Sequence, residues 1–175
     1  MKLRLLLSLI SAAFAHPFVM NAEPLAVGAP APEITAVDQD GKAVDFKSIY
    51  AKGPTLVYFY PKADTPGCTK QACSLRDEWS TLQGKSIQVI GVSGDESADQ
   101  KKFQEKYKLP FTLVADNESK VAQAFGVPLS GKIPARQSFL IMDGKIIWHM
   151  PKGSTETHAR DVLKAYQEAS QGKSA

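Results

Sequence analysis

Runs of apolar and β-branched residues alternate with polar and amphipathic stretches along the chain. Thr55–Tyr60 and Ile87–Ser93 are nearly continuous apolar runs, typical of strands buried on both faces of a sheet. A shorter run of this kind spans Leu113–Ala115. Between these runs, helices are predicted over residues 66–83, where an apolar stripe recurs, and over Ser97–Tyr107, with Ser97 as the N-cap. Strands separated by helices favour βαβ units and a mostly parallel central sheet.

Two hairpins and two further helices complete the predicted pattern. Asp40-Gly41 and Asp143-Gly144 are signals for tight turns between strands. The strands predicted around them span 33–37 and 43–46 in the first hairpin, and 138–142 and 145–149 in the second. Helices are expected over 119–125 and 155–171. We therefore expect an α/β fold, a three-layer sandwich of the thioredoxin type with a central mixed sheet and an N-terminal β-hairpin extension.

The first 15 residues have the layout of a signal peptide. Lys2 and Arg4 precede an apolar stretch over residues 5–14. Ala13 and Ala15 supply a small-x-small cleavage pattern. Export, most simply to the periplasm, is therefore expected, and disulfides persist in such a compartment. The alternative is an uncleaved membrane anchor, but the apolar stretch is shorter than the ~20 residues that a membrane-spanning helix needs.

Composition and charge narrow the classes of function. The 175 residues suit one domain, expected over 25–175 after the signal peptide (1–15) and a loose leader (16–24). The formal net charge is +3, from 21 basic and 18 acidic residues, with no basic stripe, so no nucleic-acid partner is expected. No other segment is apolar enough to cross a membrane, so stable membrane association is not expected. Two cysteines exclude a disulfide-dense small protein.

Residues 60–77 carry the candidate chemistry, directly after the most hydrophobic strand. Ligands of such sheets bind beyond the carboxyl ends of the strands. Thr65 suits an N-cap and Pro66 the first helical position, which places Cys68 in the first turn. Unpaired backbone N–H groups and the helix dipole favour an anion there, so we expect Cys68 to be partly ionised. A thiolate can attack a peroxide O–O bond and become a sulfenic acid.

Helical spacing separates the two cysteines. An apolar stripe joins the first cysteine to later residues of the predicted helix, namely Cys68, Ala72, Leu75, Trp79 and Leu82. Cys73 falls on a more polar side. Residues five apart in an α-helix have Cα atoms roughly 8–9 Å apart, beyond the roughly 7 Å that a disulfide allows. A Cys68–Cys73 bond therefore requires this turn to unwind, which would give a switch between a reduced helix and an oxidised loop.

Two other interpretations of the cysteines stay open. A static structural disulfide between Cys68 and Cys73 would close a short loop and break the helix. A zinc site is the weaker alternative, because C-x4-C spacing with three scattered histidines does not supply a tetrahedral ligand set. His16, His149 and His158 are interpreted as surface or leader residues, and no metal is expected.

The motif Pro61-x-x-x-Thr65-x-x-Cys68 resembles the active-site signature of the peroxiredoxins. The wider string TPGCTKQACSLRD is similar to the bacterioferritin comigratory protein or peroxiredoxin Q branch. The likeness covers roughly residues 25–170 and includes QVIGVSGD, KYKLPFTLVAD, a GVP tripeptide and the Arg136-Gln137-Ser138-Phe139 segment. The C-x4-C pair together with the downstream arginine makes the resemblance specific.

The resemblance implies an atypical two-cysteine thiol peroxidase that reduces hydrogen peroxide and organic hydroperoxides in antioxidant defence. Cys68 would be the peroxidatic cysteine, and Cys73 would resolve its sulfenic acid as an intramolecular disulfide. Thr65 would orient the thiolate and the peroxide through a hydrogen bond, and Pro61 would shield the thiolate from water. Arg136 would lie beside Cys68, stabilise its thiolate and polarise the peroxide oxygens.

Further implications of the resemblance concern partners. A thioredoxin-like donor would reduce the disulfide by thiol exchange. Members of this branch are commonly monomers or weak dimers and use no metal, haem or flavin cofactor. Two features depart from the usual pattern. The export signal would separate the chain from the cytosolic thioredoxin system, and Leu129–Ala135 resembles the longer plant-type connection before Arg136.

Two other functions compete with the peroxidase. An exported thiol–disulfide oxidoreductase would act on protein disulfides, but such enzymes carry C-x-x-C at this helix, and this chain carries C-x4-C. A binding or chaperone module would treat the cysteines as incidental, so Cys68→Ser would leave its function intact.

Overall fold

The structure is a computed structural model that describes residues 23–171. The predicted signal peptide and residues 16–22 of the predicted leader lie outside this range. Five strands form one mixed sheet, in the order β5-β4-β3-β8-β9. Their bounds are β3 (Thr55–Phe59), β4 (Gln88–Ser93), β5 (Thr112–Ala115), β8 (Gln137–Met142) and β9 (Lys145–Met150). β3, β4 and β5 run parallel, whereas β8 pairs antiparallel with β3 and β9 with β8.

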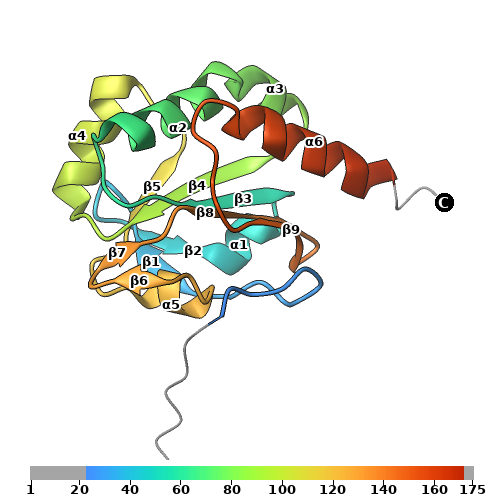
Figure 1. Ribbon diagram of the computed structural model, residues 1–175, viewed down its shortest axis with the longest axis horizontal. Helices are drawn as coiled ribbons and strands as arrows, with labels where there is room; N and C mark the ends of the chain where they lie inside the picture. The colour runs from blue at the N-terminus through green and yellow to red at the C-terminus, as the bar shows by residue number, and fades with distance from the viewer. Residues whose placement is uncertain (1–22, 172–175) are drawn as a thin grey trace, which may run out of the picture.

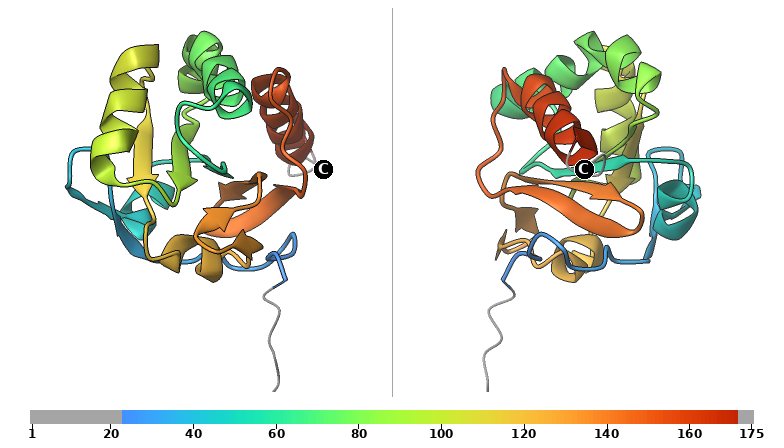
Figure 2. Two further views of the ribbon diagram at one scale, coloured as in Figure 1. Left: turned by 60° about the vertical axis from the view of Figure 1, so that its left-hand side comes forward. Right: turned by 90° about the vertical axis from the view of Figure 1, so that its right-hand side faces the viewer.

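Helices cover both faces of this sheet and give three layers (Figures 1 and 2). The helices on one face are α2 (Pro66–Asp77), α3 (Trp79–Gly84), α4 (Ser97–Tyr107) and α6 (His158–Gln171). The elements on the other face are α1 (Phe46–Tyr50), α5 (Lys120–Ala124) and the antiparallel hairpin of β1 (Thr35–Val37) and β2 (Ala43–Asp45). The predicted three-layer architecture with an N-terminal hairpin is confirmed.

Strand β3 lies at the centre of the sheet, and all five of its residues are buried. Successive side chains of a strand point to opposite faces. Accordingly, Leu56 and Tyr58 pack into the core beneath α2 and α6, and Val57 and Phe59 pack into the core beneath α5. The sequence is apolar along this whole run because both faces of the strand are buried, as predicted.

The predicted helix over residues 66–83 is two helices in the structure. Glu78 leaves the helical region (φ −96°, ψ 15°) and separates α2 from α3. No proline or glycine marks this break. The apolar stripe nevertheless continues across it, because Leu75 and Leu82 are both fully buried on the sheet side.

Other local features also differ from the prediction. The N-cap of α4 is Glu96, not Ser97, because Glu96 is extended (φ −72°, ψ 156°) and Ser97 is the first helical residue; the Ser97 hydroxyl donates to the Asp38 carbonyl 2.8 Å away. Helix α1 was not predicted; Asp45 caps it by accepting from the backbone N–H of Lys47. Helix α6 begins at His158 rather than at residue 155.

The segment Leu129–Ala135 forms a small hairpin of β6 (Leu129–Ser130) and β7 (Ile133–Pro134). The Ala135 N–H donates to the Pro128 carbonyl at its base, 2.8 Å away. Its tip packs against Gly94, where a Cβ would lie 2.2 Å from the Lys132 carbonyl oxygen. The hairpin leads directly to Arg136 and the start of β8.

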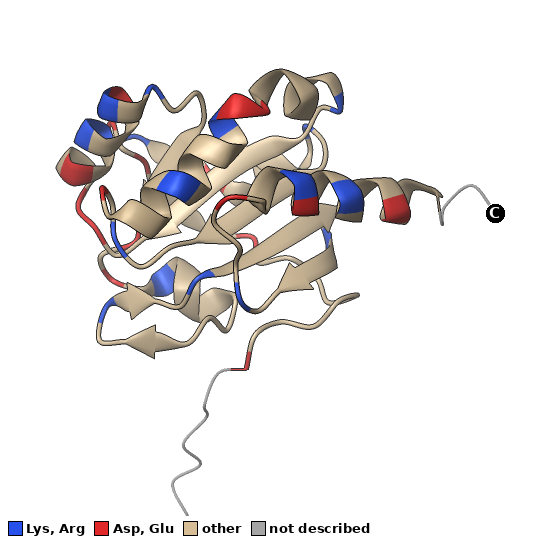
Figure 3. Ribbon diagram, turned by 45° about the horizontal axis from the view of Figure 1, so that its top comes forward, with Lys and Arg blue, Asp and Glu red and all other residues tan. Residues whose placement is uncertain are grey.

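The surface carries mixed charges. Figure 3 shows Lys and Arg interspersed with Asp and Glu on α4 and α6. Within residues 23–171, none of the helices has the length and apolar character needed to cross a membrane.

Candidate active site

The first turn of α2 holds Cys68 against the core. The helix begins at Pro66, and Thr65 is the N-cap in extended conformation, as predicted. Cys68 is only 1% exposed and packs with Tyr58, Tyr60 and Ala72. Both cysteines are free thiols, and α2 continues without a break past Cys73. The thiol therefore lies where unpaired N–H groups and the helix dipole favour an anion.

Arg136 reaches this thiol from the residue before β8. Its Nη2 donates to the Cys68 Sγ at 3.2 Å, and its Nη1 donates to the Gln71 Oε1. The Arg136 carbonyl accepts from the Gly153 N–H at 2.9 Å, which fixes the backbone on the other side. One planar guanidinium thus joins the thiol to an amide one turn further along the same helix.

The absence of side chains at Gly67 and Gly153 leaves space for the Arg136 side chain. A Cβ at Gly153 would lie 2.7 Å from the Arg136 Cγ and 3.2 Å from its Cδ. A Cβ at Gly67 would lie 3.3 Å from the Arg136 Nη2. The arginine is therefore enclosed from two directions, and its orientation toward Cys68 depends on the absence of side chains at both positions.

Gln71 is a site residue that the sequence analysis did not identify. It is fully buried, and its Nε2 has no hydrogen-bond partner among the described residues. The available signal was a long polar side chain three residues after Cys68, on the sheet-facing side of the helix. Its role here is to orient the Arg136 fork, since its carbonyl oxygen accepts from the arm that does not contact sulfur.

The loop before α2 contains the other two predicted site residues. The Thr65 hydroxyl donates to the Lys62 carbonyl at 2.9 Å and makes no capping hydrogen bond to a backbone N–H of α2. This bond uses the hydroxyl proton and leaves the oxygen lone pairs to accept a hydrogen bond. Pro61 lies directly after Tyr60, at the carboxyl end of the central strand, and is partly exposed.

Cys73 lies on the outer, more polar side of α2, as the helical spacing predicted. Partial burial raises the pKa of its thiol; the nearby Arg76 lowers that pKa, and Asp77 raises it further. Cys73 is therefore held mainly as the neutral thiol at neutral pH.

The interpretation of His158 as a surface residue was wrong. Its side chain is fully buried at the start of α6; its Nε2 lies 2.9 Å from the Ser138 Oγ, and its ring meets Tyr58 edge to face. Burial lowers the pKa of His158 to about 4; Asp161 opposes this shift and Arg136 adds to it.

His149 is half-buried rather than a plain surface residue. Its ring stacks on Phe139 with centroids 4.5 Å apart, and its Nε2 lies 3.0 Å from the Gln137 Oε1. His16 lies outside the described residues. Across residues 23–171, no three His, Cys, Asp or Glu side chains group as a metal site.

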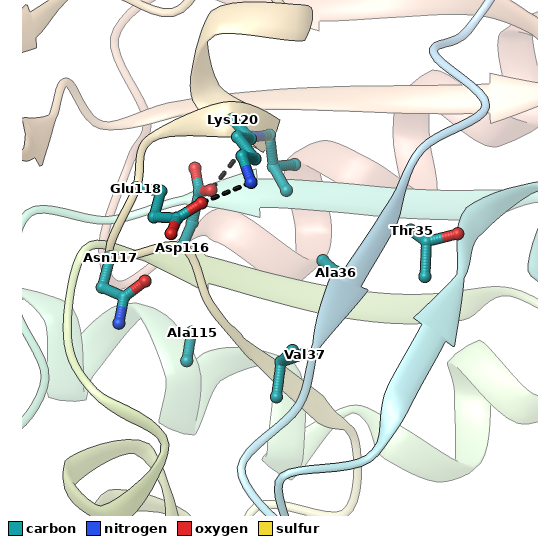
Figure 4. A pocket seen from close by; sticks show the side chains of 9 residues that line it. Thr35, Ala36, Val37, Ala115, Asp116, Asn117, Glu118 and Lys120 are labelled. Carbon is teal, nitrogen blue, oxygen red and sulfur yellow. Dashed lines mark hydrogen bonds and ion pairs between the residues drawn. The ribbon is translucent and has the colours of Figure 1, made fainter.

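A separate pocket lies on the far side of the sheet, between β1, β5 and α5 (Figure 4). Ala36, Val37 and Ala115 form an apolar part of its lining, and Glu118 and Lys120, which form an ion pair, also line it. None of the predicted site residues lines it. The predicted site residues lie instead around the start of α2.

Comparisons with known proteins point to one family. The model of the AhpC/TSA family matches residues 27–150. The chain is similar to the chloroplastic peroxiredoxin Q of Suaeda salsa, with 47% identity over 144 residues, 80% of this chain and 67% of that protein. It is 42% identical over 144 residues to the chloroplastic peroxiredoxin Q of Oryza sativa subsp. japonica, covering 80% of this chain and 66% of that protein. The match thus spans about two thirds of the length of these relatives.

Solved structures show the same architecture. Peroxidoxin BcpB of Mycobacterium tuberculosis superposes with a TM-score of 0.76 at 32% identity, covering 81% of this chain and 96% of that one. A cysteine mutant of Xanthomonas campestris peroxiredoxin Q superposes with a TM-score of 0.74 at 25% identity, covering 83% and 97%. These similarities confirm the predicted thioredoxin-type fold.

Proposed function

The chain belongs to the AhpC/TSA family, in its peroxiredoxin Q branch, and from this premise we propose that it is a thiol peroxidase reducing hydrogen peroxide and organic hydroperoxides. One observation carries the proposal, the 3.2 Å contact between the Arg136 Nη2 and the Cys68 Sγ. A guanidinium and a helix N-terminus converge on one buried sulfur, where they would stabilise the negative charge that develops on a peroxide oxygen.

In the first step, the Cys68 thiolate attacks the terminal O–H oxygen of the peroxide. The S–O bond forms as the O–O bond breaks, and the other oxygen leaves as hydroxide or alkoxide, which takes a proton from solvent to become water or an alcohol. Arg136 stabilises the charge on the oxygens as they separate. The Thr65 oxygen, whose lone pairs are not used by the bond to Lys62, accepts a hydrogen bond from the peroxide O–H and so orients the peroxide. Pro61 closes the loop over the thiolate and limits the access of water.

In the second step, Cys73 resolves the sulfenic acid. Its sulfur attacks the Cys68 sulfur, the disulfide forms, and the hydroxyl leaves as water with the Cys73 proton. In the unbroken helix the two Cα atoms are roughly 8–9 Å apart, and a disulfide needs less than about 7 Å. The turn between the cysteines must therefore unwind before this bond can form.

The remaining parts of the proposal concern recycling and location. A thioredoxin-like dithiol reduces the disulfide by exchange, and the domain over 25–175 acts as a monomer or weak dimer. We propose that residues 1–15 are a cleaved targeting segment. The plant relatives are named as chloroplastic, so the comparisons give no support to a periplasmic location.

A protein disulfide oxidoreductase is the competing function. It requires a nucleophilic thiol that a folded partner can reach. Cys68 is 1% exposed within an unbroken helix, so a folded partner protein does not reach its sulfur in this state.

The test is oxidation of the reduced protein by hydrogen peroxide in a stopped-flow instrument, with intact mass before and after. We expect fast oxidation and a loss of two hydrogens, and no peroxide consumption by Cys68→Ser. Retained turnover in Cys68→Ser would refute the assignment. Slow oxidation of the wild type, combined with rapid reduction of insulin, would support the disulfide oxidoreductase instead.

A further inference from the structure

The loop that leads into α2 is tied to the C-terminal end of α4. Both carboxylate oxygens of Asp64 accept from the Lys106 Nζ, at 2.7 and 2.9 Å, and one also accepts from the Tyr107 Oη at 2.6 Å. Asp64 has φ +57°, in the left-handed region that non-glycine residues rarely adopt. The contacts of Asp64 to Lys106 and Tyr107 therefore help to maintain this loop conformation.

The same end of α4 also holds the later part of α2. Arg76 lies three residues after Cys73, and its Nη1 donates to the Tyr107 carbonyl at 2.9 Å. The Tyr107 ring packs edge to face on the buried Phe103, with centroids 5.4 Å apart. We call Lys106 and Tyr107 the α4 corner. In Figures 1 and 2, α4 lies beside the start of α2 and the loop before it.

A second carboxylate, that of Asp95, also binds the loop before α2. Asp95 Oδ2 accepts from the Ala63 N–H at 2.8 Å and from the Ser93 hydroxyl at 2.7 Å. Ser93 is fully buried at the end of β4, and its Oγ accepts from the Gln100 amide of α4 at 2.7 Å. Asp95 and Ser93 thus connect the loop to α4 at a second place, through Gln100.

These contacts bear on the distance that the two cysteines must close. The loop before Cys68 and the turn after Cys73 are attached to a single corner, so the length of α2 between them is held near its helical value. Unwinding that segment requires at least one of the attachments to open.

We propose that Asp64 and Tyr107 are positioning residues that hold α2 in its helical state and thereby set the rate at which Cys73 reaches the oxidised Cys68. The inference rests on the resolving role of Cys73 under the proposed function. The step it controls is balanced within the chain. The S–S bond forms, the S–O bond of the sulfenic acid breaks, and water leaves with the Cys73 proton, so no further oxidant or reductant is needed.

Two variants weaken the attachment with little other change. Asp64→Asn removes the charge but keeps a side chain that tolerates the left-handed backbone. Tyr107→Phe removes the hydroxyl but keeps the ring against Phe103. The matched control is Asp40→Asn, which breaks an ion pair of 2.8 Å between Lys101 of the same helix and the loop between β1 and β2, away from α2.

The first readout is hydrogen exchange of the α2 amides in the reduced full-length protein, without peroxide. Because charge-assisted bonds are lost at a partly exposed site, we expect α2 to exchange about three- to tenfold faster in Asp64→Asn and Tyr107→Phe. Exchange in β3 and β4 should not change, and Asp40→Asn should match the wild type. Unchanged α2 exchange in both variants, or equal acceleration in the control, would overturn the proposal.

The second readout is the rate of disulfide formation after one equivalent of hydrogen peroxide, followed by acid quench and intact mass. We expect both variants to form the disulfide faster by a factor similar to that in exchange. An unchanged rate alongside faster exchange would overturn the kinetic role of the corner. If no disulfide forms in any protein, wild type included, while α2 exchange still responds to the variants, the resolving role of Cys73 fails and the attachment of α2 to the corner stands.

Discussion

Gly153→Ala should slow the reaction with peroxide although no group of the site is removed. The new Cβ would lie 2.7 Å from the Arg136 Cγ and 3.2 Å from its Cδ. Ordinary carbon contacts are about 3.5–4.0 Å, so the arginine has to move by about 1 Å. The Cγ is only two bonds from the backbone, so the side chain cannot relieve the clash by bending at its tip.

This displacement reaches the sulfur. The Arg136 Nη2 lies 3.2 Å from the Cys68 Sγ, and a shift of about 1 Å away from it abolishes a useful hydrogen bond. Misplacement by this amount costs about 10²-fold in rate, and loss of one preorganised donor costs about 10²–10³-fold. We therefore expect the second-order rate constant for oxidation by hydrogen peroxide to fall by about 10²-fold.

Two other glycines make the test a graded series. In Gly67→Ala the new Cβ would lie 3.3 Å from the Arg136 Nη2, the mobile end of the side chain, so a smaller loss is expected. In Gly84→Ala the new Cβ meets nothing within 4 Å, and the rate should match that of the wild type.

The assay is stopped-flow oxidation of each reduced variant under excess peroxide, with urea unfolding to establish that each is folded. A folded Gly153→Ala variant that reacts as fast as the wild type would show that the position of Arg136 does not limit the reaction. Equal slowing in Gly84→Ala would mean that the effect is not local.

Three further measurements bear on the site. Cys73→Ser should keep the first oxidation but stall turnover with a dithiol donor, because no second thiol displaces the sulfenic hydroxyl; normal repeated turnover with thioredoxin would contradict the resolving role. Arg136→Lys keeps the charge but not the fork, so one amine cannot hold both the Cys68 sulfur and the Gln71 amide; we expect slower oxidation in the stopped-flow assay, and a wild-type rate would refute the role of the fork. The pKa of His158 is about 4 in the folded protein, against an ordinary 6.5. The unfolded chain therefore takes up the proton first as the pH falls. The free energy of unfolding should decrease between about pH 6.5 and 4, by up to about 3 kcal/mol. Urea unfolding at pH 7.5 and 5 checks this, with His158→Asn expected to flatten the difference; a wild type equally stable at both values would contradict it.

The strands of the central sheet were predictable because their apolar runs reflect burial in the core. Thr55–Tyr60 was predicted as a doubly buried strand, and β3 spans Thr55–Phe59 with every residue buried. The Asp143-Gly144 turn was equally readable, since both residues have positive φ in the structure, which suits a tight hairpin. The local sequence is enough to predict this strand and this turn.

Other features depend on tertiary contacts that no local pattern records. The break at Glu78 has no proline or glycine to announce it. His158 lies between Thr157 and Ala159, and its burial follows from how α6 packs on Tyr58 and Ser138. The hairpin at Leu129–Ala135 has two-residue strands, too short for periodicity to detect.

The site residues also fall into two groups, those that the local sequence predicts and those that depend on contacts between distant segments. Cys68 could be placed at a helix N-terminus from Thr65 and Pro66 alone. Arg136 lies 68 positions away in the chain, so only its place in a known motif suggested the contact that the structure shows. Gln71 and the α4 corner were not identified, because their partners are set by packing between distant segments.

The attachment of Arg136 to the sheet and of Cys68 to the helix has a consequence for the redox potential. Under the proposed cycle, reduction of the disulfide lets α2 refold and returns the thiolate to the guanidinium, so the free energy of refolding adds to the driving force for accepting electrons. Each 1.4 kcal/mol gained in this way raises the potential of the disulfide by about 30 mV. A helix that has to unwind for oxidation thus makes the oxidised protein easier for its donor to reduce.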